Sequence, residues 1–199
     1  MTLPDRIQSN SSPERRGIYV ALAILSLLTV TILALRWQGR LWWCAIQDLS
    51  PWAGDIGNRH TSQHLLDPYT FTHVLHGLIL CGLLVLILPR LAMRWRFVLA
   101  ITIEAAWEVF ENTSYVINRY REATAAIGYQ GDSIINSLGD ILACAGGFAL
   151  AMRLGFRRTV ALFLLTELGL LLWIRDSLLL NIILLIHPIE MIKSWQMGR

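Results

Sequence analysis

The chain has 199 residues, of which 55% are hydrophobic and only 16% are charged, and this composition is too apolar for a water-soluble domain of that size. Eight tryptophans, few charges and three scattered cysteines exclude a disordered chain, a coiled coil and a disulfide-rich scaffold. The net charge of +3 is a small surplus that does not indicate nucleic-acid binding. The composition predicts a membrane protein whose partner is lipid.

The first predicted membrane span covers residues 17–35, which carry no charge and are long enough to cross a hydrocarbon core of about 30 Å. This stretch is too long for a signal peptide and lacks a small-residue cleavage site, which favours an uncleaved anchor. Residues 1–16 are predicted to be a cytoplasmic tail. The tryptophan-rich connection from about Trp37 to Leu66 is predicted to lie along the outer membrane surface.

Four further spans are predicted at 68–88, 96–112, 133–152 and 159–174. The second span begins at Asp67-Pro68, which is typical of an N-cap followed by proline at the first helical position. The segment 177–195 has only a short apolar run before Pro188, and it is either a broken sixth span or an interfacial helix. The predicted fold class is therefore all-α: a polytopic transmembrane bundle of five spans plus a C-terminal sixth hydrophobic or interfacial helix, with 17–199 as one membrane domain.

Basic residues in short loops predict the orientation of these spans. With the N-terminus inside, the inner segments hold nine arginines, whereas the outer segments hold six that are spread over longer loops. The N-terminus is accordingly predicted to be cytoplasmic.

Acidic side chains interrupt the predicted spans, where each ionised group costs roughly 3 kcal/mol on insertion scales. Their spacing places them on common helix faces, as does that of two histidines near the start of the second span. The three sets are Glu104, Glu108 and Glu111; Asp132, Asn136 and Asp140; and His73 and His76. With alternating span directions all three sets fall in the outer half of the membrane, which predicts one site. Gly77, beside the histidines, is expected to let another helix come close.

Several of these residues also have structural interpretations. Asp132 is either a site residue or only an N-cap, and Glu111 and Asn112 are either site residues or simply leave the membrane. Glu167, alone in the fifth span, either pairs with the cluster or is a protonated core acid. The three cysteines, at positions 44, 81 and 144, are expected to be small core residues.

Histidine nitrogens and carboxylate oxygens are ligands of zinc, non-haem iron and manganese, and a divalent metal ion would neutralise clustered acids. The predicted metal ligands are His73, His76, Glu104, Glu108, Asp132 and Asp140. Glu108 and Asp140 are the predicted catalytic residues, with a free glutamate as general base. Arg119 and Arg121 in an outer loop either bind a phosphate head group or face water. No HExxH, GxSxG or P-loop motif is present.

These residues favour a metal-dependent hydrolase or transferase that acts on an envelope lipid or a lipid-linked phosphate. One alternative is a cation or proton transporter in which the same acids bind the ion, although no second polar stripe completes a path through the inner half. The other alternative is a non-catalytic membrane partner protein.

The motifs resemble those of VanZ-like bacterial membrane proteins: FTHVLHG at 71–77, EAAWEVFEN at 104–112, and YQGDSIINSLGD at 129–140, followed by Gly146-Gly147. They look closest to a short inner-membrane family of Gram-negative bacteria, which the WIRDS turn at 173–177 also resembles. Asn136 departs from the broader group, which often has an acid there. The resemblance implies a multi-pass protein of the cytoplasmic membrane and supports the three sets as one site, without naming a reaction.

Overall fold

The computed structural model describes residues 13–198, and over this range the chain is all-helical, as predicted. Residues 1–12 of the predicted tail lie outside the described residues, and residues 13–16 form the first turn of α1 instead of tail. The helices are α1 (Pro13–Trp37), α2 (Thr70–Ile87), α3 (Met93–Glu111), α4 (Ser114–Ala123), α5 (Ile134–Leu154), α6 (Phe156–Ile174), α7 (Leu178–Ile186) and α8 (Glu190–Met197). The described residues form no sheet, and a single isolated bridge joins Trp52 to Leu66.

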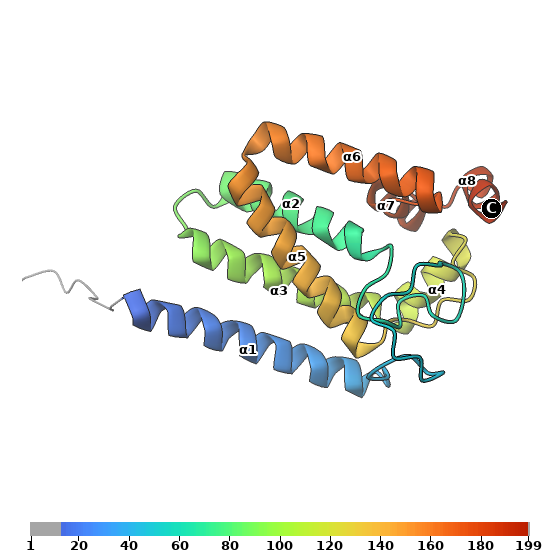
Figure 1. The fold of residues 1–199 in the computed structure, drawn as a ribbon, viewed down its shortest axis with the longest axis horizontal. Coiled ribbons are helices and arrows are strands. Elements are labelled where there is room, and N and C mark those ends of the chain that lie inside the picture. The colour runs from blue at the N-terminus through green and yellow to red at the C-terminus, as the bar shows by residue number, and fades with distance from the viewer. Residues whose placement is uncertain (1–12, 199) are drawn as a thin grey trace, which may run out of the picture.

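The five long helices run side by side, with their connections at two opposite ends (Figure 1). The 38–69 connection, α4 and α8 gather at one end. The short turns from α2 to α3 and from α5 to α6 lie at the other end. Because the chain reverses at each turn, the start of α2, the end of α3 and the start of α5 meet at the loop-rich end, and they carry the predicted polar residues there.

α2 and α5 form the closest helix pair, and glycine makes the approach possible. A Cβ atom on Gly77 would lie 2.0 Å from the carbonyl oxygen of Cys144, and one on Gly147 would lie 2.1 Å from that of Val74. Any larger residue would therefore collide with the facing backbone. This observation confirms the expectation for Gly77 and identifies α5 as its partner.

Apolar side chains fill the bundle beyond the polar residues. The main buried cluster draws on α2, α3, α5 and α7, with Phe148 fully buried near its centre. Its members are Leu75, Leu78, Cys81, Leu84, Ala100, Phe148, Ala151 and Leu178. Arg96 closes this end by donating to the carbonyl oxygens of Leu88 and Pro89, at 2.9 and 2.6 Å, beyond the last turn of α2.

Within residues 13–198, three helices are long and apolar enough to cross a membrane: α1 over Gly17–Trp37, α2 and α5. The bent pair of α6 and α7 would make a fourth crossing if it counts as one span. α3 has 19 residues but carries arginines and three glutamates, so hydropathy does not identify it as a span. The count of five spans plus one remains a prediction.

The segment 177–195 is not one helix, because the chain breaks around Pro188 between α7 and α8. α7 turns by 74° from α6 and has nine residues, about 14 Å of helix, which is less than half of a hydrocarbon core. Glu167 is buried at this bend, and its carboxylate accepts the backbone N–H groups of Leu178 and Leu179 at 2.9 and 3.2 Å. Glu167 therefore caps α7, a role that neither sequence interpretation foresaw.

Candidate functional site

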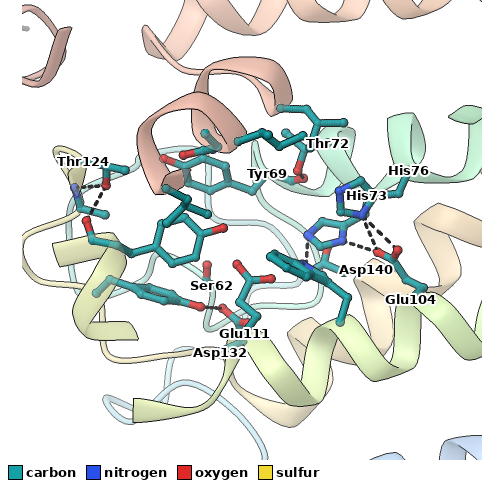
Figure 2. A pocket seen from close by; sticks show the side chains of 18 of the residues that line it. Ser62, Tyr69, Thr72, His73, His76, Glu104, Glu111, Thr124, Asp132 and Asp140 are labelled. Carbon is teal, nitrogen blue, oxygen red and sulfur yellow. Dashed lines mark hydrogen bonds and ion pairs between the residues drawn. The ribbon is translucent and has the colours of Figure 1, made fainter. Parts of the chain in front are cut away.

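A cavity of about 380 Å³ lies at the loop-rich end, between α2, α3, α4, α7 and the segment that leads into α5 (Figure 2). Its polar lining includes Thr61, Ser62, Tyr69, Thr72, His73, His76, Glu104, Glu111, Asp132 and Asp140. Its apolar lining includes Ile79, Leu80, Ile103, Leu178, Ile182 and Leu185, three of which come from α7. The cavity therefore offers acids and histidines together with a hydrocarbon-like surface.

Glu104 binds both histidines of α2. Its Oε1 lies 2.6 Å from Nδ1 of His73, and Nδ1 of His76 lies 3.0 Å from each Glu104 oxygen. A carboxylate accepts hydrogen bonds, so we assign the proton of each ring to Nδ1, which leaves each Nε2 with a lone pair. Metal-binding histidines are commonly oriented in this way by a carboxylate behind the ring.

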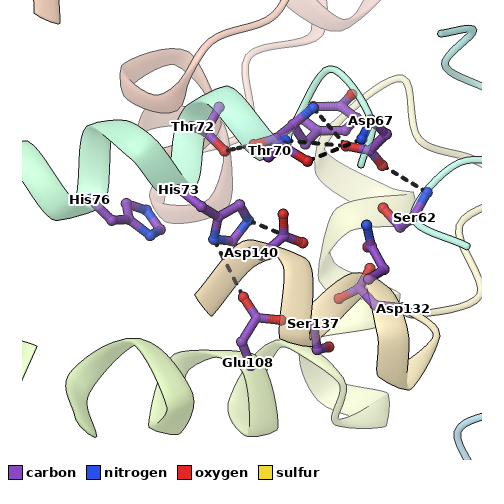
Figure 3. A network of polar contacts seen from close by, with 12 residues as sticks. Ser62, Asp67, Thr70, Thr72, His73, His76, Glu108, Asp132, Ser137 and Asp140 are labelled. Carbon is purple, nitrogen blue, oxygen red and sulfur yellow. Dashed lines mark hydrogen bonds and ion pairs between the residues drawn. The ribbon is translucent and has the colours of Figure 1, made fainter. Parts of the chain in front are cut away.

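Asp140 and Glu108 flank His73 from α5 and α3 (Figure 3). Oδ2 of Asp140 lies 3.8 Å from Nε2 of His73, and Oε1 of Glu108 lies 3.3 Å from its Nδ1. Glu108 is 0% and Asp140 3% exposed. Both Glu108 oxygens and Oδ1 of Asp140 accept no hydrogen bond from any residue that the structure describes. Buried carboxylate oxygens normally accept a hydrogen bond or contact a cation, because an unsatisfied buried charge is costly. These three oxygens therefore favour a bound cation or protonation of the carboxyl groups.

Asp132 extends the cluster toward the loop. Its carboxylate accepts the hydroxyl of Tyr129 at 2.8 Å and the side-chain amide of Asn112 at 2.9 Å, and its own N–H donates to Asn112 Oδ1 at 2.7 Å. Burial raises the pKa of Asp132 from 3.8 to about 6, although both hydrogen bonds oppose the shift. Asp132 is not the N-cap of α5, because the hydroxyl of Ser133 accepts the Asn136 N–H. Asn112 is 1% exposed and joins the end of α3 to Asp132.

The structure brings the six predicted metal ligands together in three overlapping groups. Within each group one ligand atom per residue lies within 4.8 Å of the others. The groups are His73, His76 and Glu104; His73, Glu108 and Asp140; and Glu108, Glu111 and Asp132. Glu111, for which the sequence allowed two interpretations, also lines the cavity. Glu108 does not line it and lies behind His73.

Other predicted residues lie outside this cluster. Asn136 donates to the carbonyl oxygen of His64 at 2.8 Å and so holds the 38–69 connection against α5. Arg119 lies on helix α4 instead of a loop and donates to the carbonyl oxygens of Leu185 and Ile186 at the end of α7. Arg121, on the same helix, donates to Tyr129 and Gln130. Neither arginine lines the cavity.

The start of α2 also differs from the sequence prediction. α2 begins at Thr70 instead of residue 68. Asp67 still acts as a cap, because its carboxylate accepts the N–H groups of Tyr69 and Thr70 at 2.8 and 3.2 Å. Its other oxygen accepts the N–H of Ser62, which links the cavity wall to α2.

Comparison with known proteins identifies a family. The family described as "Protein of unknown function (DUF2585)" matches residues 35–198. A UPF0314 protein of Rhizobium meliloti is 42% identical over 190 residues, which is 96% of each chain. A UPF0314 protein of Brucella anthropi is 40% identical over 190 residues, again 96% of each chain, and one of Paracoccus denitrificans is 41% identical over 175 residues, 87% of this chain and 90% of that one. No solved structure matches this chain.

Proposed function

Since this chain belongs to the DUF2585 family, we propose a function for it from the chemistry of its cavity: a membrane-embedded, metal-dependent hydrolase or transferase that acts on the polar head of an envelope lipid or lipid-linked phosphate. The helices that are apolar enough to cross a membrane support the lipid setting. We further propose that the protein lies in a bacterial inner membrane, with its N-terminus in the cytoplasm and its cavity on the outer side. Kinship with VanZ-like proteins stays a prediction, on which the proposal does not depend.

The observation that carries the proposal is the pair of buried carboxylates beside His73. Glu108 and Asp140 present three oxygens that accept no hydrogen bond from the described residues, although one of them, Oε1 of Glu108, lies 3.3 Å from Nδ1 of His73. Two ionised carboxylates at this burial would repel each other, and a divalent cation would neutralise both. His73, Glu108 and Asp140 form the inner ligand set, which His76 and Asp132 extend. When bound, such an ion supplies Lewis acidity toward water and toward a phosphoryl or acyl oxygen.

We assign separate roles to Glu104, Asp140 and Glu108 from their contacts and their positions relative to the cavity. Glu104 holds both histidines with Nε2 available, which makes it a positioning residue or a ligand on the far edge of the site. Asp140 lines the cavity with Oδ1 unpartnered, so it is the better general base. Glu108 is fully buried behind the lining, so it serves as a ligand and not as the base.

The lining defines the class of substrate. Four acids face the cavity, and no lysine or arginine does so among the described residues. An anionic head group would therefore be repelled unless a metal ion lay between it and the acids. Leu178, Ile182 and Leu185 offer a surface for a hydrocarbon tail. We assign Arg119 and Arg121 a positioning role, because they hold α7 and the 129–130 loop.

The same observations weaken the transporter alternative. The polar cluster ends at the apolar core around Phe148, which occupies the half of the bundle that an ion would still have to cross.

Turnover of defined amphiphiles tests the proposal. The purified protein, loaded with zinc or manganese, is incubated in detergent with a lipid-linked monophosphate, a lipid-linked diphosphate and a phospholipid, and release of phosphate or head group is measured. We expect turnover of at least one substrate, abolished by chelation and reduced about 100-fold or more in Asp140→Asn. The matched control is Glu190→Gln on exposed α8. Metal-dependent activity that Asp140→Asn retains in full would overturn the site assignment, and no turnover by a metal-loaded protein would favour the non-catalytic partner alternative.

A further inference from the structure

A second group of metal-ligating side chains lies in the 38–69 connection, away from the acidic cavity. Cys44, His60 and His64 each offer one ligand atom within 4.8 Å of the other two. Cys44 and His64 are 5% and 0% exposed, and His60 is half-buried. None of the three lines the cavity, so this group is separate from the site described above.

Hydrogen bonds define which atoms of this group carry lone pairs. Nδ1 of His64 lies against the carbonyl oxygen of Ser50, which can only accept, so this nitrogen carries the proton. Nε2 of His64 is therefore a lone-pair donor, and it lies 2.9 Å from Nδ1 of His60.

Two further ligand atoms approach the same nitrogen of His60. Sγ of Cys44 lies 3.7 Å from it, and Oδ2 of Asp48 lies 3.6 Å from it. One N–H on His60 can satisfy only one of these three neighbours well. Cys44, His60 and His64 thus present a sulfur and two nitrogens within 4.8 Å of one another, and the Asp48 carboxylate lies beside His60.

The spacing of these atoms is close to that of a tetrahedral zinc site. With Zn–S of about 2.3 Å and Zn–N of about 2.0 Å, tetrahedral angles separate sulfur from nitrogen by about 3.5 Å and two nitrogens by about 3.3 Å. The observed sulfur–nitrogen separation is 3.7 Å and the nitrogen–nitrogen separation is 2.9 Å. The two histidine nitrogens would have to move apart by about 0.4 Å, and the sulfur of Cys44 lies within 4.8 Å of the His64 ligand nitrogen.

We propose that Cys44, His60 and His64 bind one zinc ion, with Asp48 or water as the fourth ligand. Thiolate and imidazole ligands select zinc over magnesium and calcium, which prefer oxygen. The spacing Cys-x15-His-x3-His places Cys44 near the start and both histidines near the end of the 38–69 connection, which contains no helix. This inference stands on different residues from the proposed function and does not depend on it.

The ion would stabilise the wall of the cavity. The carbonyl oxygen of His64 accepts the side-chain amide of Asn136 on α5. Ser62, two residues before His64, lines the cavity, and its backbone N–H donates to Asp67. Binding that pulls Cys44 and His60 together restrains the whole segment between them. The site is therefore structural, and it would set the shape of the nearby cavity without touching substrate.

Cobalt substitution tests this proposal through a signal that only a thiolate ligand produces. The full-length protein in detergent is loaded with Co²⁺, and the thiolate-to-cobalt charge-transfer absorption in the near ultraviolet is recorded. We expect this band in the wild type, in Cys81→Ala, whose cysteine lies in the helical core, and in the Glu104→Gln/Asp140→Asn double variant. Cys44→Ser should abolish it. No band in the wild type, or a band that survives in Cys44→Ser, would overturn the proposal.

A second measurement covers the case in which Cys44→Ser fails to fold. His60→Ala removes a half-buried side chain, and we expect it to lower the affinity for zinc at this site at least tenfold. In wild-type protein, chelation should accelerate proteolysis within 38–69, and added zinc should reverse the effect. Cleavage that is indifferent to zinc, together with unchanged affinity in His60→Ala, would equally contradict a structural ion.

Discussion

Asp132 is a buried acid in the loop between α4 and α5, and its burial opposes the ionised form. It is 7% exposed, and burial raises its pKa to about 6 in spite of the hydrogen bonds from Tyr129 and Asn112. A raised pKa means that the folded protein favours the neutral carboxyl. A bound cation at the Glu108, Glu111 and Asp132 group would favour the ionised form instead.

The pH dependence of stability therefore differs between metal-free and metal-loaded protein. In metal-free protein the favourable contribution of neutral Asp132 is complete below its unfolded pKa of 3.8 and is lost as the pH rises through about 6. We expect the melting temperature of chelated wild type to fall between pH 4 and pH 7 by the equivalent of about 2–3 kcal/mol more than that of Asp132→Asn. Equal slopes in the two proteins would contradict the assigned burial effect. Saturating metal should reverse the wild-type slope.

The helix pair α2 and α5 sets the distance between the histidines and Asp140. Gly147 faces the backbone of Val74, whereas a Cβ atom on Gly146 would point into open space. We expect Gly147→Ala to lower the free energy of unfolding by about 1–3 kcal/mol, because backbone must move, and to weaken metal binding as His73 and Asp140 separate. Gly146→Ala is the matched control and should leave both properties unchanged. Equal thermal melts for the two variants would contradict the close packing.

Helix α7 receives a cap from another helix in addition to its own N-cap, Ser177, whose hydroxyl accepts the Leu180 N–H. Both oxygens of Glu167 accept its first N–H groups, and the carboxylate also lies favourably at the positive end of the helix. Glu167→Ala should destabilise the protein by about 1–3 kcal/mol and loosen α7, while the metal content stays unchanged. Thermal melting and elemental analysis check the two halves of this expectation. Loss of metal in Glu167→Ala would contradict this expectation and would indicate that Glu167 contributes to metal binding in the acidic site.

The elements differ in how far the sequence alone could predict them. Uncharged runs and capping residues act locally, so they indicated the long helices to within a few residues. α4 was missed, because its ten residues are polar and follow Asn112, which looked like an exit from the membrane. Pro188 predicts the break between α7 and α8. The 74° bend between α6 and α7 could not be predicted, because the Glu167 carboxylate at this bend accepts backbone N–H groups from a different helix.

At the scale of the whole molecule, the clustering of the acids and histidines could be predicted, because helix periodicity and alternating span direction place these residues at one end. The roles within it were not. Whether Glu108 faces the cavity, or Arg119 a head group, depends on side-chain packing between elements that no local pattern encodes. The Cys44, His60 and His64 group had a visible signal, a cysteine followed by His-x3-His, but its spacing matched no complete zinc motif.

The two proposed sites should bind metal independently. The acidic cavity and the 38–69 connection use separate residues, so each should bind its ion without the other. Isosteric variants suit this comparison, because Glu104→Gln and Asp140→Asn keep side-chain volume while they remove charge.

Elemental analysis of the purified protein beside the Glu104→Gln/Asp140→Asn double variant is the most direct test, with equal folding verified by thermal melting. After supplementation with zinc, manganese and iron, the wild type should hold two divalent ions per chain and the double variant one. Equal metal content in the two proteins would contradict a metal site in the acidic cavity.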